Sequence, residues 1–223
     1  RFKKILDSSK EKKPQSIEEA IKNVKKNCTT KFDESIDVSF NLNFKQKKKE
    51  EITLRTVVQL PNGNGKKIKI AVLCEESKAE DAKSAGADIF NSETLIKDIT
   101  SGKINFDKLI STTTMMPKMS KLGKILGPKG LMPNPKLGTV TNNVKDAVFA
   151  LKSGQIEVRA DKDANLGASI GKKSFSDSKI LENYNKFYET LLKEKPASIK
   201  GDFIISSFLT STMGVSYKIK LGK

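Results

Sequence analysis

The chain has 223 residues, 36% of them hydrophobic and 30% charged, which is enough to bury one large core or two small ones. Its 42 Lys and Arg against 26 Asp and Glu give a net charge of +16. Such a charge is typical of proteins that bind nucleic acid or an anionic membrane. No run approaches the roughly 18 apolar residues of a membrane span, and Trp is absent, so nucleic acid is the favoured partner. The absence of His excludes Ser-His-Asp catalysis, Cys-His catalysis and His-ligated zinc.

The remaining chemistry-bearing residues indicate no active site. Cys28 and Cys74 lie too far apart for a metal-ligand spacing and fit small, partly buried thiols in a reducing compartment. No carboxylate stands in an apolar stretch of the kind that tunes a group for acid–base work. We therefore expect no catalytic residue, no metal and no cofactor.

The N-terminal part predicts a helix and then a strand. Ser16 followed by Glu19 is a capping-box pattern, and residues 17–27 continue with helical periodicity. Residues 35–44, SIDVSFNLNF, alternate apolar and polar side chains. That period of two is typical of a strand with one buried face.

A charged connection and a second strand follow. Residues 45–51, KQKKKEE, are expected to form a hairpin loop, and residues 51–60 to form the returning strand. Pro61, Gly63 and Gly65 then interrupt the pattern and mark the first candidate domain boundary.

From Lys66 the pattern changes to alternating strands and helices. The apolar run 68–74 predicts a strand buried on both faces, and short strands are expected at 87–90 and 106–112. Helices are expected over residues 77–87 and over residues 92–102, the second with Ser92 as N-cap and Gly102 at its end. A third helix is expected to begin near Pro117, and a fourth to span residues 142–154 with Asn142 or Asn143 as N-cap. This alternation up to Gly154 favours a small parallel α/β unit.

Residues 118–139 are the most unusual stretch of the chain. They contain four glycines and three prolines, and no Asp or Glu occurs from Lys108 to Lys145. Because Gly and Pro interrupt regular structure and lysines resist burial, we expect a stiff, cationic, exposed loop that meets polyanions and is no core element. Its glycine spacing fits neither dinucleotide nor P-loop fingerprints, so no nucleotide site is expected. Its lysines are Lys118, Lys121, Lys124, Lys129 and Lys136.

After Gly154 the strands return to antiparallel character, so the two ends of the chain resemble each other and differ from the middle. We predict an α/β (α+β) fold of two domains: a discontinuous antiparallel α+β domain from residues 1–64 and 155–223, and an inserted Rossmann-like parallel α/β domain from residues 65–154. Gly63, Gly65 and Gly154 would form a hinge between them. Three successive units without a discontinuity remain the alternative.

Residues 118–141, KMSKLGKILGPKGLMPNPKLGTVT, resemble the signature of the large-subunit ribosomal protein L-one family in its bacterial and organellar form. KFDESIDVSFNLNF, LRTVVQLPNGNGKKIKIAV, AGAD, SGQIEVRADK and FLTSTMG extend the resemblance in order and spacing over nearly the whole chain. The resemblance implies a structural, non-enzymatic protein of the large subunit that binds the mobile rRNA stalk near the tRNA exit site. It also implies help in releasing deacylated tRNA, possible repression of its own messenger, and a monomeric state when free.

The resemblance also implies which residues contact RNA. On pattern alone, Phe32 is more typical of a core residue. Residues 211–216 are more typical of an ordinary tight turn, and residues 161–163 of a solvated hairpin end. The resemblance instead assigns Phe32, the turn and Lys162 to RNA contact. The five lysines of 118–139 would face stalk rRNA and exit-site tRNA. The implied rRNA contacts of the terminal domain are Lys31, Phe32, Ser35, Arg159, Lys162, Gly167, Ser206, Thr212, Met213, Gly214 and Ser216.

The chain also departs from the family pattern. Thr56 stands where many relatives have Gly, Asn62 replaces a common His, and Val215 stands where Pro is frequent, which is expected to loosen the RNA-contacting turn. The Lys- and Asn-rich composition and the start at Arg1 instead of Met indicate an organelle, a plastid ahead of a mitochondrion, with the bacterial cytoplasm as the other location.

Two other functions stay open beside the ribosomal one. A free RNA-binding regulator or chaperone would share the positive charge without a stable place on the ribosome. A nucleotide-dependent enzyme on the Rossmann-like part would need a phosphate fingerprint that the sequence lacks. No membrane partner is expected.

Overall fold

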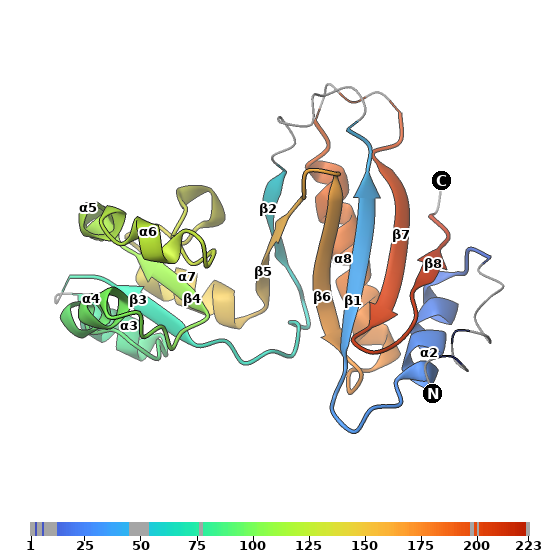
Figure 1. Cartoon of the computed structure of the whole chain (residues 1–223), viewed down its shortest axis with the longest axis horizontal. Helices are drawn as coiled ribbons and strands as arrows, with labels where there is room; N and C mark the ends of the chain where they lie inside the picture. Colours follow the sequence, from blue (N-terminus) through green and yellow to red (C-terminus); the bar gives the residue numbers. More distant parts are fainter. Residues whose placement is uncertain are drawn as a thin grey trace. The chain divides into compact units, whose positions relative to one another are not determined.

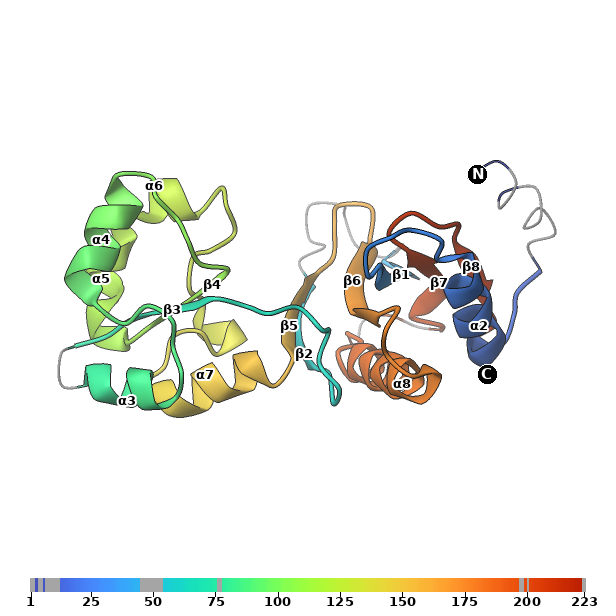
Figure 2. The ribbon, with the colours of Figure 1, turned by 90° about the horizontal axis from the view of Figure 1, so that it is seen from below.

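The computed structural model describes residues 3, 6, 13–44, 54–75, 78–196, 199 and 201–221. Contacts between residues divide the chain into two compact units (Figures 1 and 2). Unit 1 contains Arg1–Gly65 and Gly154–Lys223, and unit 2 contains Lys66–Ser153. The predicted fold class is confirmed, since unit 1 is an antiparallel α+β body made of both chain ends and unit 2 is an inserted body with parallel strands. The alternative of three successive units is wrong.

Unit 1 is built on a four-stranded sheet in which every neighbouring pair is antiparallel. The strand order is β6-β1-β7-β8, and helices α2 and α8 lie against one face of the sheet (Figure 2). The bounds are α2 Ile17–Asn27, β1 Ser35–Leu42, β6 Asn165–Lys172, α8 Asp177–Lys193, β7 Ile204–Ser211 and β8 Tyr217–Ile219.

The predicted alternation of β1 is confirmed and gives the sheet two different faces. Ile36, Val38, Phe40 and Leu42 are buried against the helices. Phe40 stacks on Phe187 of α8 at a ring-centroid distance of 5.4 Å. The side chains between them are polar, so the face away from the helices is a polar surface. The predicted capping box of α2 is also confirmed.

The predicted hairpin after β1 is wrong. β1 has β6 on one side and β7 on the other, so it leaves no edge for residues 55–59. β2, Arg55–Gln59, pairs instead with β5, Gln155–Arg159, as a separate antiparallel ribbon. The cause is physical: alternation reports which face of a strand is buried, and it does not report which strand lies beside it. The predicted hairpin loop, residues 45–51, lies outside the described residues.

Unit 2 has a parallel core. β3, Ile70–Leu73, is buried at every position and pairs in parallel with β4, Lys108–Ser111. Single parallel bridges at Ile89 and Val140 continue this sheet on its two sides. The helical elements are α3 Ala79–Ser84, α4 Ser92–Thr100, η3 Thr113–Met115, α5 Met116–Ser120, α6 Gly123–Leu126, η4 Pro135–Leu137 and α7 Val144–Lys152.

Three expectations for unit 2 need correction. Asn91, not Ser92, caps α4, since its Oδ1 accepts from the N–H groups of Glu93 and Thr94 while the Ser92 hydroxyl bonds the backbone of Cys74. The helix expected near Pro117 is two short helices, because Gly123 weakens a continuous one. The strand at 87–90 is reduced to the bridge at Ile89.

Both cysteines are buried, and neither forms a disulfide bond. Within the described ranges, no helix is long and apolar enough to cross a membrane.

Candidate nucleic-acid interface

Two segments that are 177 residues apart meet at one end of the four-stranded sheet. The Thr212 N–H donates to the Ser35 carbonyl over 3.1 Å, and the Ser35 N–H donates to Thr212 Oγ1 over 3.0 Å. These bonds join the loop before β1 to the turn after β7. We call residues 30–35 and 211–216 together the corner.

A buried carboxylate joins the two halves of the corner. Glu34 is 1% exposed. Its Oε1 accepts from the Thr30 N–H at 3.2 Å and from Thr30 Oγ1 at 2.7 Å, and its Oε2 accepts from the Met213 N–H at 3.2 Å. Burial acts to raise the pKa of Glu34, but hydrogen bonds such as those from Thr30 and Met213 outweigh it, so the pKa lies below its ordinary 4.5. Glu34 is therefore ionised at neutral pH.

The corner presents apolar side chains to solvent. Phe32 is 53% exposed and Met213 is 61% exposed. The backbone beneath them is fixed, since Thr30 Oγ1 donates to the Phe32 carbonyl at 3.1 Å and Glu34 holds the Met213 N–H. An exposed aromatic ring on a fixed backbone is a platform for an unstacked base.

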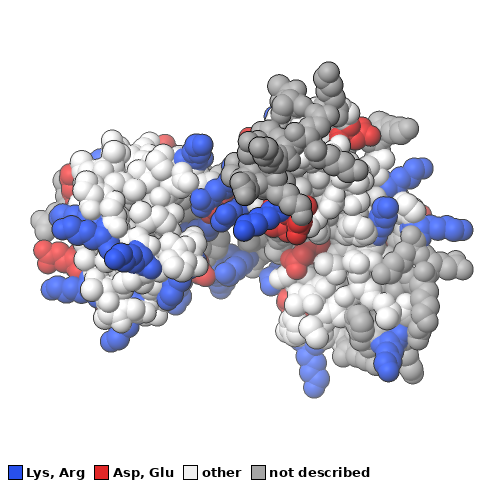
Figure 3. Space-filling view, turned by 45° about the horizontal axis from the view of Figure 1, so that its top comes forward, with Lys and Arg blue, Asp and Glu red and all other residues white. Residues whose placement is uncertain are grey.

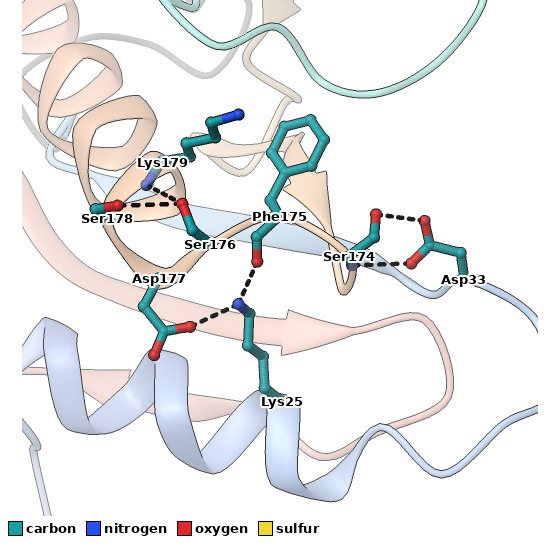
Figure 4. Close-up of polar contacts among 8 residues, drawn as sticks. All are labelled: Lys25, Asp33, Ser174, Phe175, Ser176, Asp177, Ser178 and Lys179. Atoms are coloured by element: carbon teal, nitrogen blue, oxygen red, sulfur yellow. Dashed lines mark hydrogen bonds and ion pairs between the residues drawn. The ribbon is translucent and has the colours of Figure 1, made fainter.

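A second carboxylate anchors the other side of the loop (Figure 4). Asp33 accepts from the N–H and the hydroxyl of Ser174, at 3.1 and 2.8 Å. Beyond Ser174, the Lys25 ammonium of α2 binds the Phe175 carbonyl and the Asp177 carboxylate. The loop that carries Phe32 is thus tied to the connection between β6 and α8.

The remaining predicted residues of the turn have distinct surroundings. Gly214 cannot carry a side chain without a shift, because its Cβ would lie 2.4 Å from Ser211 Oγ. Val215 is buried, Ser216 is half-buried, and Lys31 is exposed beside Phe32.

The other predicted contacts lie away from the corner. Gly167 and Ser206 are on the polar face of the sheet, opposite Ser39 and Asn41 of β1. Arg159 and Lys162 are exposed near the turn that enters β6, at the far end of the sheet. That end is on the order of 20 Å from the corner at about 3.4 Å per strand residue. The structure therefore divides the predicted set into three groups and does not gather it at one point.

Residues 118–139 of unit 2 are only partly the exposed loop that we expected. All five predicted lysines are exposed, and Figure 3 shows basic side chains in blue on the visible face of this unit. The expectation that the segment is no core element is wrong, since Met119, Leu122, Leu126 and Leu137 are buried. Met119, Leu122 and Leu126 recur at steps of three and four residues, which is helical spacing, although glycines and prolines interrupt the segment.

The predicted hinge glycines all have positive φ angles, of 64°, 73° and 102° at Gly63, Gly65 and Gly154. A Cβ on Gly154 would lie 2.5 Å from the Gly63 Cα, so glycine is required where the segment after β2 approaches the residue before β5. Asn183 of α8, which is fully buried, accepts from the Asn62 N–H and donates to the Gly63 carbonyl.

Sequence reasoning missed Asp33, Glu34, Ser174 and Asn183. The only available signal was the pair of acids directly after Phe32 in a basic chain. Polar residues are most often exposed, so nothing marked Glu34 and Asn183 as buried. In the part of the chain that the structure describes, no group of three or more His, Cys, Asp or Glu could hold a metal ion.

Comparison with known proteins shows a ribosomal-protein family. Residues 24–215 match the model of the Ribosomal protein L1p/L10e family, and the chain belongs to that family. The resemblance drawn from the sequence is thus confirmed.

The relatives share a common name, and the similarity covers most of each chain. The chain is 58% identical over 224 residues to "Large ribosomal subunit protein uL1" of Pelagibacter ubique (strain HTCC1062), covering 100% of this chain and 97% of that protein. It is 44% identical to the protein of that name from Rickettsia akari (strain Hartford), covering 98% and 92%. The chain is 45% identical to a third protein of that name, from Rickettsia peacockii (strain Rustic), covering 92% of this chain and 86% of that protein. These relatives are bacterial, and they give the expected organelle no support.

Proposed function

We propose that this protein is a structural, non-enzymatic constituent of the large ribosomal subunit and binds rRNA through unit 1. Membership of the family and the names of its relatives support the ribosomal role. The net charge of +16 would attract a polyanion at long range. Bacterial relatives favour the bacterial cytoplasm as its location.

The observation that carries the RNA-binding proposal is the corner. Phe32 and Met213 offer apolar surface to a base or ribose. The exposed Thr212 hydroxyl accepts from the Ser35 N–H and donates to the Ser35 carbonyl, and it offers its remaining acceptor site. Lys31 adds a cation at the same place. Folded RNA is recognised through shape, 2′-hydroxyls and splayed bases, and these groups suit such contacts. Arg159, Lys162, Gly167, Ser206, Gly214 and Ser216 would extend the contact.

The finer proposal is that the rRNA is the mobile stalk near the tRNA exit site. The lysines of 118–139 would then face stalk rRNA and the leaving tRNA. A hinge at Gly63, Gly65 and Gly154 would let unit 2 follow the stalk as deacylated tRNA is released. Repression of the protein's own messenger would use the same unit 1 surface, and the free protein would be a monomer.

The test is binding of the full chain to a transcript of the large-subunit rRNA stalk of Pelagibacter ubique. The reversed sequence of equal length is the control RNA. Preference for the stalk by a factor of about 1,000 or more is expected for specific recognition. Equal affinity for both RNAs would contradict the proposal.

The second candidate function is a free RNA-binding regulator or chaperone, which the same exposed corner would also serve. Sedimentation of a cell extract separates the two. The ribosomal proposal expects the protein in the large-subunit fraction, and a wholly free pool would favour the regulator.

A further inference from the structure

The corner contains an apparent contradiction for a surface that binds RNA. Asp33 and Glu34 follow Phe32 directly, and a carboxylate beside a phosphate backbone is repelled. In a chain with 16 more cations than anions, two adjacent acids at this place require an explanation.

The hydrogen bonds supply that explanation. Both oxygens of Glu34 accept hydrogen bonds, and Glu34 is 1% exposed, so its charge is directed into the protein. Both oxygens of Asp33 accept from Ser174. Glu34 is therefore an internal acceptor, whereas Asp33 is exposed but has both oxygens bonded to Ser174.

The partners of Glu34 are the two segments that display Phe32 and Met213. One oxygen binds Thr30, whose single hydroxyl hydrogen is shared between this oxygen at 2.7 Å and the Phe32 carbonyl at 3.1 Å. The other oxygen binds the Met213 N–H. Removing this carboxylate would free Thr30 and Met213 from their shared acceptor, and the Ser35–Thr212 bonds would still join the two segments. Ordering them again on the RNA would cost affinity, which a preformed corner avoids.

We propose that Glu34 is a positioning residue for RNA recognition: it holds Phe32 and Met213 as one preformed apolar platform for an unpaired nucleotide. Asp33 fixes the same loop from the side of Ser174. This inference rests on the proposed RNA-binding function of unit 1. It adds that an acid which need not touch RNA sets the strength of binding.

Glu34→Gln tests the proposal with little change of shape. One of the two side-chain positions that now accept would become an amide NH₂ group and face an N–H donor. With the stalk transcript of Pelagibacter ubique, we expect the Kd of E34Q to rise roughly ten-fold or more, because the platform is no longer preformed. Glu189→Gln is the matched control, because it makes the same change at an exposed position of α8 that belongs to none of the predicted RNA contacts. It removes one negative charge from the exposed side of α8, and its Kd should stay the same or fall.

A double-mutant cycle with Phe32→Ala separates a positioning role of Glu34 from a merely structural one. If Glu34 positions Phe32, then F32A weakens binding strongly in the original chain and much less in the E34Q chain. Equal losses in both backgrounds would overturn the proposal, and so would an E34Q variant with unchanged affinity.

A further variant covers the case in which E34Q does not fold. Thr30→Val keeps the shape but removes the hydroxyl that links Glu34 to the Phe32 carbonyl. It should weaken binding several-fold while circular dichroism stays native, and unchanged affinity would overturn the proposal. Failure of the unmodified chain to prefer the stalk over the reversed RNA would instead remove the proposed function itself.

Discussion

The corner of unit 1 and residues 118–139 of unit 2 are both proposed to meet RNA, and they are built in opposite ways. The corner has one exposed lysine, one buried acid, one exposed acid that is bonded to Ser174, and two exposed apolar side chains on a hydrogen-bonded backbone. The unit 2 segment has five exposed lysines and no acid. A fixed apolar surface recognises shape, whereas exposed cations give attraction that salt screens. The corner should therefore carry affinity, and the lysines should carry salt dependence.

The largest expected effect is that of Phe32→Ala. Loss of a stacking platform should weaken binding to the stalk transcript by about 1–3 kcal/mol. Phe32 is 53% exposed, so the unfolding temperature should change little. Titration of the full chain with the transcript, paired with a thermal melt, checks both. A matched loss of stability and affinity would make Phe32 a core residue instead.

Thr212→Val should come next. The variant keeps the volume but loses the hydroxyl that accepts from the Ser35 N–H at 3.0 Å. We expect about 1 kcal/mol less stability from the lost hydrogen bond, and a further loss of affinity because the same hydroxyl would contact RNA. Urea unfolding and RNA titration of the same preparation measure the two losses. An affinity that does not fall would remove Thr212 from the interface.

Acid should weaken the corner through Glu34. The folded pKa of Glu34 lies below 4.5, so its contribution to stability is present above that pH and is lost as pH falls through the folded pKa. The unfolding temperature of the original chain should therefore fall on acidification below about pH 4.5 more steeply than that of E34Q. Parallel thermal melts from pH 7 to pH 3 measure this. Identical slopes would show that Glu34 is not stabilised as a carboxylate.

The smallest expected effect is that of replacing Lys121, Lys124 and Lys129 together by alanine. All three are exposed in unit 2, so a minimal stalk RNA gripped by unit 1 should lose less than about three-fold in affinity. A titration at several salt concentrations checks this and also gives the salt slope. A collapse of affinity would mean that the principal grip lies in unit 2.

The fold was more predictable than the interface, for reasons that particular residues show. Alternation from Ser35 to Leu42 and the capping box at Ser16 report local geometry, and both were confirmed. The pairing of β2 with β5 depends on distant partners, which a local pattern does not contain. Phe32 and the 211–216 turn were assigned through resemblance, since on pattern alone they suggested a core residue and a plain turn. The burial of Glu34 was missed because it depends on a partner 179 residues further along the chain, Met213, which the local pattern does not contain.

The most direct test of the central claim compares Phe32→Ala with the triple lysine variant on the same stalk transcript in the same salt. If the corner is the main RNA-binding surface, F32A loses roughly five-fold or more in affinity and the triple variant loses less than about three-fold. The opposite ranking, with the lysine variant the weaker binder, would contradict the account.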